Sequence, residues 1–203
     1  MTVRDILKSK HLQLPSPDQF QALVKAIREA GAWCSKQCGD LVEFLAFSGC
    51  RLDEAAWIEW SDVNEAGGFI WVHGDPFNST KNSERRQVPI IPAMAWLLAD
   101  LKTSPRLIRD KNRQGKNYVL AITECQKALD RWCPKLKITR ITHHDLRHLF
   151  ATACIESGVD IPTVSRWLGH RDGGVLAMKT YGHLRNEHSQ AMAAKVTFGA
   201  AKV

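Results

Sequence analysis

The chain has 203 residues, of which 44% are hydrophobic and 24% charged, and its formal net charge is +7. This length and composition predict an ordinary globular protein with one good-sized domain. The sequence lacks the run of ~20 apolar residues that a membrane span needs, and it lacks the apolar stretch of a secretion signal. We therefore expect a cytoplasmic protein that does not span a membrane.

Signals of secondary structure follow one another along the chain. SPDQ at 16–19 is typical of a helix start, with serine as N-cap, proline in the first turn and glutamine placed for a capping box, and the helical spacing ends at Gly31. Residues rich in β-branched and aromatic side chains predict strands at 69–72 and 87–90, joined by a long polar connection. Further helices are expected near 39–48, 52–58, 92–101, 123–133, 144–157 and 161–168, with a last one around Tyr181. The predicted fold class is mainly α with a small antiparallel β-sheet (α+β).

Three side chains later in the sequence are expected to begin helices. Thr123 with Gln126 predicts a second capping box, and Thr142 and Asp160 are predicted N-caps. Gly169 is expected to end the helix that Asp160 begins.

Basic residues are concentrated in one part of the sequence. Eleven lysines and arginines and three acidic residues lie between Lys102 and Arg140, so this segment carries all of the excess positive charge. Its first part, 102–117, is predicted to be an exposed, mobile loop. Such a surface suits a polyanionic partner, although a solubilising face without a partner explains the charge equally well.

The six cysteines show no disulfide pattern and are expected to be free thiols in a reducing compartment. Cys34 and Cys38 can share a helix face and, with a histidine, bind a metal. Because no second closely spaced pair supports this, no metal site is predicted.

Two patterns in the first half of the chain place basic side chains at turns. In SGCRLDEA at 48–55, Gly49 permits a tight turn that presents Arg51 at a helix start, although such an arginine is more often a surface residue paired with Asp53 or Glu54. Lys81 lies in the connection between the strands, where solvated surface is the ordinary explanation.

Two further patterns lie near the C-terminus. His144 and Arg147, in HHDLRH, are three residues apart on a predicted helix and can contact one small anion together. His170 follows the helix end at Gly169 and is free to face a pocket. Tyr181 is one of two tyrosines, and an isolated tyrosine is usually a packing residue.

Five features of the sequence, taken together and in their order, resemble the tyrosine recombinase, or phage integrase, family. They are Arg51, Lys81, the HDLRH segment 144–148, the LGH segment 168–170 and the tyrosine that follows. The resemblance extends from about residue 16 to 188. It implies a site-specific recombinase catalytic domain that cuts and rejoins DNA.

The resemblance also implies a role for each matching residue. Tyr181 would attack the scissile phosphodiester, leaving a 3′-phosphotyrosine and a free 5′-hydroxyl. Arg51 and Arg147 would bind the non-bridging oxygens. The remaining three residues would move protons or bind the phosphate: Lys81 as general acid for the 5′-oxygen, His144 in proton transfer with the tyrosine, and His170 as a hydrogen-bond donor to the phosphate.

The residue types suit this chemistry in themselves. A phenol with a pKa near ~10 is mostly protonated at neutral pH, and nearby guanidinium groups would lower that pKa. Because arginines supply the positive charge and the phosphotyrosine conserves the bond energy, no cofactor, metal or ATP is expected.

Two departures from the family pattern affect the expectations. The segment between His170 and Tyr181 contains Gly173-Gly174 and is longer than usual, so the tyrosine is expected either on a longer loop or held away from the phosphate until DNA or another subunit binds. Only residues 1–15 precede the first helix, too few for the family's additional DNA-binding domain, which indicates a fragment or a minimal protein.

The expected organisation is an extension at 1–15, a catalytic domain at 16–190 and a tail at 191–203 that packs on a neighbouring subunit or frays. Expected partners are double-stranded DNA attachment sites, accessory proteins and further copies of the chain, as a homo-tetramer on DNA and a monomer without it, associated with the nucleoid when bound. The candidate DNA-binding residues are Arg85, Arg86, Lys111, Arg113, Lys116 and Arg140.

Two other functions stay open. One is a DNA-binding integrase remnant without efficient catalysis. The other is a type IB topoisomerase-like strand transferase, against which the LGH segment favours a recombinase.

Overall fold

The computed structural model describes residues 13–74, 85–170, 175, 178 and 180. The described chain forms two compact units, one ending at Phe150 and the other beginning at Ala151. In this part of the chain, no helix combines the length and the apolar composition that crossing a membrane requires.

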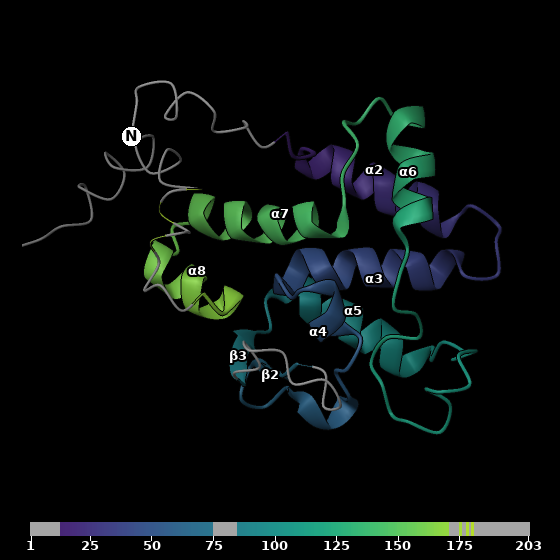
Figure 1. Cartoon of the computed structure of the whole chain (residues 1–203), viewed down its shortest axis with the longest axis horizontal. Helices are drawn as coiled ribbons and strands as arrows, with labels where there is room; N and C mark the ends of the chain where they lie inside the picture. The colour runs from purple at the N-terminus through teal and green to yellow at the C-terminus, as the bar shows by residue number, and fades with distance from the viewer. Residues whose placement is uncertain (1–12, 75–84, 171–174, 176–177, 179, 181–203) are drawn as a thin grey trace, which may run out of the picture. The chain divides into compact units, whose positions relative to one another are not determined.

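The first unit is mainly helical, and α3 lies at its centre. Its helices are α2 (Pro17–Arg28), α3 (Ser35–Ser48), α4 (Leu52–Ala55), the 3-10 helix η1 (Trp60–Asp62), α5 (Pro92–Thr103), α6 (Gln126–Lys135) and the beginning of α7 (His143–Glu156). Helix α3 packs against α2 and α5, and α2 also packs against α6 (Figure 1). Leu41, Phe44 and Leu45 of α3 are fully buried, so this helix supplies the middle of the core.

A small antiparallel sheet completes the first unit. Its strands, in the order β1-β2-β3, are β1 (Val63–Asn64), β2 (Phe69–Val72) and β3 (Arg86–Pro89). Ile70 of β2 pairs with Val63 on one side and Val88 on the other. The predicted fold class is therefore confirmed, with one strand more than expected, because the two residues of β1 are too few to show an alternating pattern.

Local capping signals explain where several helices begin. Ser16 Oγ accepts a hydrogen bond from the Gln19 backbone N–H, and the Gln19 side chain accepts one from the Ser16 N–H, which is the predicted capping box. At the start of α7, Thr142 Oγ1 accepts from the Asp145 N–H and Asp145 Oδ2 accepts from the Thr142 N–H. Both predicted helix starts are confirmed.

The capping box predicted at Thr123 is wrong. Helix α6 begins at Gln126 after Cys125, and the Gln126 side chain donates to Asp130 Oδ1 and to the Ile141 carbonyl instead of reaching back. The carboxylate of Glu124 accepts a hydrogen bond from the Gln126 backbone N–H. A nearby acidic side chain therefore satisfies the helix start that the threonine was expected to satisfy.

In the second unit, α7 ends at Glu156 and α8 covers Ile161–Leu168. Asp160 Oδ1 accepts a hydrogen bond from the Thr163 N–H and caps α8, while Gly169, with φ of 71°, ends it. Both residues have the predicted roles.

Candidate active site

The turn after α3 places Arg51 at the start of α4. Ser48 Oγ donates to the Phe44 carbonyl and accepts from the Cys50 N–H, which holds the chain as it leaves the helix. Gly49 follows with φ of 64°, a left-handed conformation that favours glycine. Arg51 is then the N-cap residue of α4, and its side chain is 40% exposed. The predicted presentation of this arginine at a helix start is confirmed.

Glu54 of α4 binds two arginines. Its carboxylate accepts from the Arg51 backbone N–H over 2.8 Å and from Arg51 Nη1 over 2.9 Å. Arg86 of β3 donates through Nη1 and Nη2 to the two carboxylate oxygens, over 2.8 and 2.6 Å. Burial alone would raise the pKa of Glu54, but the hydrogen bonds and charges of Arg86 and Arg51 lower it to about 2. The carboxylate therefore stays ionised at every physiological pH.

Arg147 of α7 is tied to the same turn. It is 3% exposed, and its Nη1 donates to the Gly49 carbonyl over 2.7 Å. Burial lowers the pKa of Arg147 to about 10, and the positive charges of Arg51 and Arg86 act in the same direction. Arg147 still carries its charge at neutral pH, next to the turn that presents Arg51.

His144 lies one helical turn before Arg147. Burial lowers the pKa of His144, and the charges of Arg147 and Arg51 lower it further. Its ring meets that of His148 edge to face, with centroids 4.7 Å apart. His144 is therefore a neutral imidazole at pH 7, beside two guanidinium groups.

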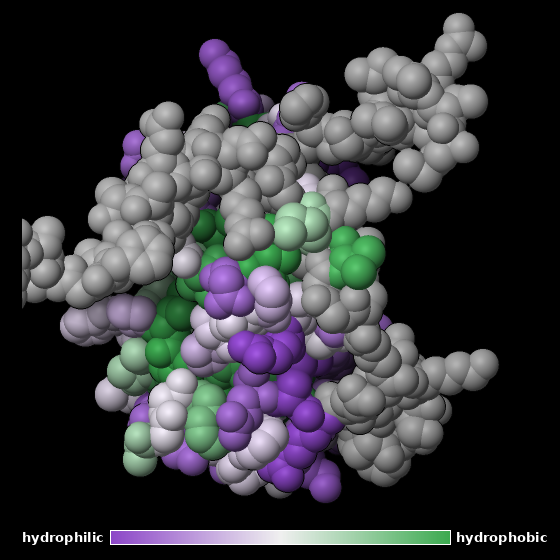
Figure 2. Space-filling view, turned by 90° about the vertical axis from the view of Figure 1, so that its left-hand side faces the viewer, coloured by the Kyte–Doolittle hydropathy of each residue, from purple (hydrophilic) through white to green (hydrophobic). Residues whose placement is uncertain are grey.

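This arrangement is chemically suited to a phosphate. The guanidinium groups of Arg51 and Arg86 bind the one carboxylate of Glu54, and Arg147 is near enough for the charges of all three to shift its pKa, so positive charge is in excess. Arginines provide planar, permanently charged donors to phosphate oxygens. On the face shown in Figure 2, hydrophilic residues gather in the lower half, with hydrophobic residues beside and above them.

The other three predicted catalytic residues are placed differently. His170 belongs to the second unit, where its backbone N–H donates to the Ser165 carbonyl just after the end of α8. Lys81 and Tyr181 lie outside the described residues. Of the predicted set, Arg51, His144 and Arg147 are thus brought together within the first unit.

Arg113 has a different place from the one expected. The prediction of an exposed side chain in the loop 102–117 is wrong for this residue, which is 6% exposed. Its Nη2 donates to the carbonyls of Ala56 and Leu120, over 2.7 and 3.1 Å, and its guanidinium stacks 4.4 Å from the ring of Tyr118. Burial lowers the pKa of Arg113. The side chain holds the loop to the core instead of presenting charge to a partner.

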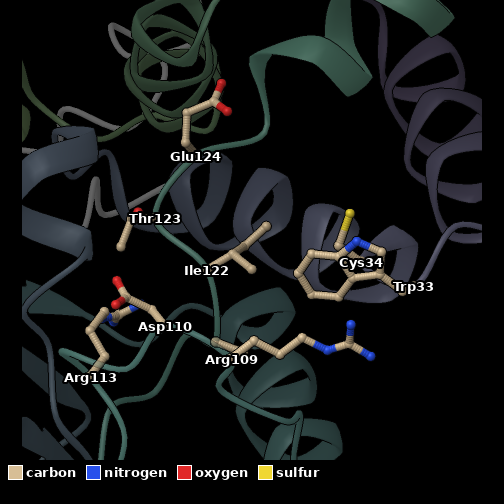
Figure 3. Close-up of a pocket in the computed structure, with 9 residues that line it drawn as sticks. Trp33, Cys34, Arg109, Asp110, Arg113, Ile122, Thr123 and Glu124 are labelled. Atoms are coloured by element: carbon tan, nitrogen blue, oxygen red, sulfur yellow. The ribbon is translucent and has the colours of Figure 1, made fainter.

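Arg113 also lines a pocket of about 230 Å³, whose other residues include Trp33, Arg109, Asp110 and Glu124 (Figure 3). Arg109 extends along this pocket and stacks on Trp33, with 4.4 Å between guanidinium and ring.

The remaining candidate DNA-binding residues differ in how far contacts within the protein engage their side chains. Arg86 binds Glu54, and its side chain is 11% exposed, so sequence reasoning missed its internal partner. Arg140 pairs with Asp130 but stays 61% exposed. The other three candidates are exposed. Arg85 stacks on a tryptophan, with 4.2 Å between its guanidinium and the ring, and Lys111 and Lys116 lie in the loop 102–117.

The cysteines in the described part of the chain are free thiols. Cys125 Sγ lies 3.4 Å from His143 Nε2. Within the described residues, no group of three or more His, Cys, Asp or Glu side chains is arranged to hold a metal ion.

Sequence reasoning named Glu54 only as an alternative partner of Arg51 and did not include it in the candidate site. The available signal was its position three residues after Arg51, which suits a carboxylate that caps the helix start and pairs with the arginine. The spacing could not indicate Arg86, which is 32 positions from Glu54 and extends the local pair of Arg51 and Glu54 to a three-residue cluster.

Comparison with known proteins agrees with the fold. The tyrosine recombinase XerD of Lacticaseibacillus casei is 31% identical over 162 residues, covering 75% of this chain and 52% of that protein. The chain thus spans about half the length of the curated relatives that it matches.

Solved structures share the fold. A Tn1549 transposon integrase in complex with a circular intermediate DNA matches 97% of this chain and 70% of its own, with a TM-score of 0.70 at 15% identity. A lambda integrase tetramer bound to a Holliday junction matches 80% of this chain and 48% of its own, with a TM-score of 0.56 at 17% identity. Residues 15–188 match the phage integrase family, and the chain belongs to that family.

Proposed function

We propose that this chain is the catalytic part of a site-specific DNA recombinase, which cuts and rejoins DNA through a 3′-phosphotyrosine at Tyr181. The observation that carries the proposal is the placement of Arg51 and Arg147 at one turn, with the Gly49 carbonyl holding one arginine and Glu54 holding the other. Membership of the phage integrase family supports it.

In the proposed reaction, the Tyr181 oxygen forms a bond to phosphorus and the bond to the 5′-oxygen breaks. Arg51 and Arg147 donate hydrogen bonds to the non-bridging oxygens, where negative charge grows in the transition state. Because Arg147 is buried and held before the substrate arrives, its donors need little reorganisation when the reaction begins.

Two other side chains transfer the protons, and a third binds the phosphate. His144, neutral at pH 7, accepts the phenolic proton, and Lys81 protonates the departing 5′-oxygen. His170 donates a hydrogen bond to the phosphate. Rejoining reverses these steps, since the phosphotyrosine ester retains the energy of the broken bond.

The proposed partners are double-stranded DNA and three further copies of the chain. Support comes from structural relatives that are described with DNA, one of them as a tetramer on a Holliday junction. Residues 191–203, which lie outside the described part, are proposed to pack on a neighbouring subunit.

The test is a DNA substrate that is nicked near the cleavage site, so that the cut fragment diffuses away and traps the intermediate. The wild-type chain should form a protein–DNA adduct that survives denaturation, and Tyr181→Phe should form none. DNA binding without an adduct would support a remnant that only binds, and relaxation of supercoiled DNA without site preference would support a topoisomerase-like enzyme.

A further inference from the structure

We propose that Arg86 is a positioning residue for strand cleavage, which acts through Glu54 to orient Arg51. The inference rests on the proposed function, because Arg51 is the residue that would contact the scissile phosphate. It assigns to Arg86 a role inside the protein, in place of the DNA contact that its sequence position suggested.

The geometry of the carboxylate carries the proposal. Glu54 Oε1 accepts from Arg51 Nη1 and from Arg86 Nη1, and Oε2 accepts from the Arg51 backbone N–H and from Arg86 Nη2. Each oxygen is thus shared between the two arginines. The rigid fork of Arg86 sets the plane of the carboxylate, and that plane sets the direction of the Arg51 side chain.

Burial distinguishes the two arginines. The side chains of Arg86 and Glu54 are 11% and 10% exposed, whereas that of Arg51 is 40% exposed. The inner pair therefore forms a support, and the outer arginine has accessible surface with which to meet a ligand. Arg86 is also the first residue of β3 and pairs with Val72 of β2, so the support is anchored in the sheet.

Charge gives the support a second effect. If Glu54 were paired with Arg51 alone, either the two charges would cancel, or burial would protonate the carboxyl and weaken its hold on Arg51. The second guanidinium keeps Glu54 ionised and restores the positive charge that a phosphate requires. Arg86 therefore maintains both the direction of Arg51 and the net charge of the cluster.

The experiment compares Arg86→Met with Arg106→Met in the full chain. Arg106 is a matched control, because its side chain is 9% exposed and binds Asp40 and Asp100, outside the proposed site. DNA affinity and the single-turnover rate of adduct formation on a nicked substrate are measured for both. Arg86→Met should cleave bound DNA roughly 10- to 100-fold more slowly, the scale expected for a displaced catalytic group, with an affinity close to that of the wild type. Arg106→Met should cleave at the wild-type rate.

Two further variants separate positioning from general loss of structure. Arg86→Lys keeps the charge without the fork and should recover part of the rate. If Arg86 acts through Glu54, the double variant Glu54→Gln/Arg86→Met should be no slower than the slower single variant. In Arg86→Met, protonation of Glu54 should add a second acid limb to the pH–rate profile, beside the limb that protonation of His144 gives in the wild type and in the variant alike.

A spectroscopic measurement keeps the inference testable if the chain does not cleave DNA. Nuclear magnetic resonance of the Arg51 guanidinium should show restricted rotation in the wild type and in Arg106→Met, and faster rotation in Arg86→Met. Absence of any adduct with the wild-type chain would overturn the proposed function alone. Unchanged Arg51 rotation, an unchanged cleavage rate, or a loss confined to DNA affinity in Arg86→Met would overturn the role of Arg86.

Discussion

Arg147 Nη1 donates to the carbonyl oxygen of Gly49 over 2.7 Å, although the two residues are 98 positions apart. This bond connects the buried arginine of α7 to the turn that presents Arg51. Since Gly49 has a left-handed conformation, its carbonyl direction depends on the turn itself. The two phosphate-binding candidates thus share one piece of backbone, and moving either arginine disturbs the other.

Arg147→Lys should reduce the rate of adduct formation by roughly 10²–10³-fold, the cost of losing a well-placed donor to a developing oxyanion. Lysine keeps a positive charge but lacks the planar fork that can reach both Gly49 and a phosphate oxygen. The measurement is single-turnover cleavage of a nicked substrate at saturating protein. A variant as fast as the wild type would show that Arg147 is only structural.

The free energy of unfolding should decrease as the pH is lowered from 7 towards 5, in part because of His144. The pKa of His144 is lower in the folded state than the ordinary value of about 6.5. As the pH falls, the unfolded state therefore binds the proton first. The contribution of His144 to the free energy of unfolding is fully present above the unfolded pKa and is lost as the pH falls below it. Denaturant unfolding at several pH values measures this, and His144→Gln should show a shallower dependence.

His143 contributes in the same direction, since burial lowers its pKa as well. The slope should therefore be reduced in His144→Gln without vanishing. An identical slope in the variant and the wild type would show that His144 titrates alike in both states.

Lys111 and Lys116 should contribute to DNA affinity through phosphate contacts alone. Both are exposed in the loop 102–117. Replacing both with glutamine should weaken binding to specific and unrelated DNA alike, and should reduce the slope of log affinity against log salt by about 0.9 for each phosphate that the variant no longer neutralises. Fluorescence anisotropy at several salt concentrations measures this slope, and an unchanged slope would remove the loop from the DNA-binding surface.

Arg113→Ala should lower the stability of the fold and leave the salt dependence of DNA binding unchanged. It removes the donor to the carbonyls of Ala56 and Leu120 and the stacking on Tyr118, so it should destabilise the fold by about 1–3 kcal/mol. The salt slope of DNA binding should stay at the wild-type value, once measured at a temperature where the variant is folded. A stable variant with a reduced slope would return Arg113 to the DNA-binding set.

Local signals in the sequence were sufficient for most of the helices. The capping residues Ser16, Thr142 and Asp160 and the turn at Gly49 act over three or four residues, so their side chains can be interpreted without the rest of the fold. The strand β1 could not be found in this way, because it is defined by pairing with Ile70 and not by its own two residues.

The catalytic grouping as a whole was accessible only through the family resemblance. Spacing suggested the local pairs, Arg51 with Glu54 and His144 with Arg147, but not the contacts that come from distant parts of the chain. Which arginines of a basic chain turn inward depends on distant partners, as Arg113 with Ala56 and Arg86 with Glu54 show. Composition gives the total charge, while burial decides how much of it is available to DNA.

The most direct test of the proposed chemistry is to identify the side chain that is joined to DNA. The adduct from the nicked substrate is digested with protease, and the peptide that carries the nucleotide is sequenced by mass spectrometry. We expect the 3′-phosphate on Tyr181, an adduct with Tyr118→Phe, and none with Tyr181→Phe. A nucleotide on any other side chain, or an undiminished adduct with Tyr181→Phe, would contradict the assignment.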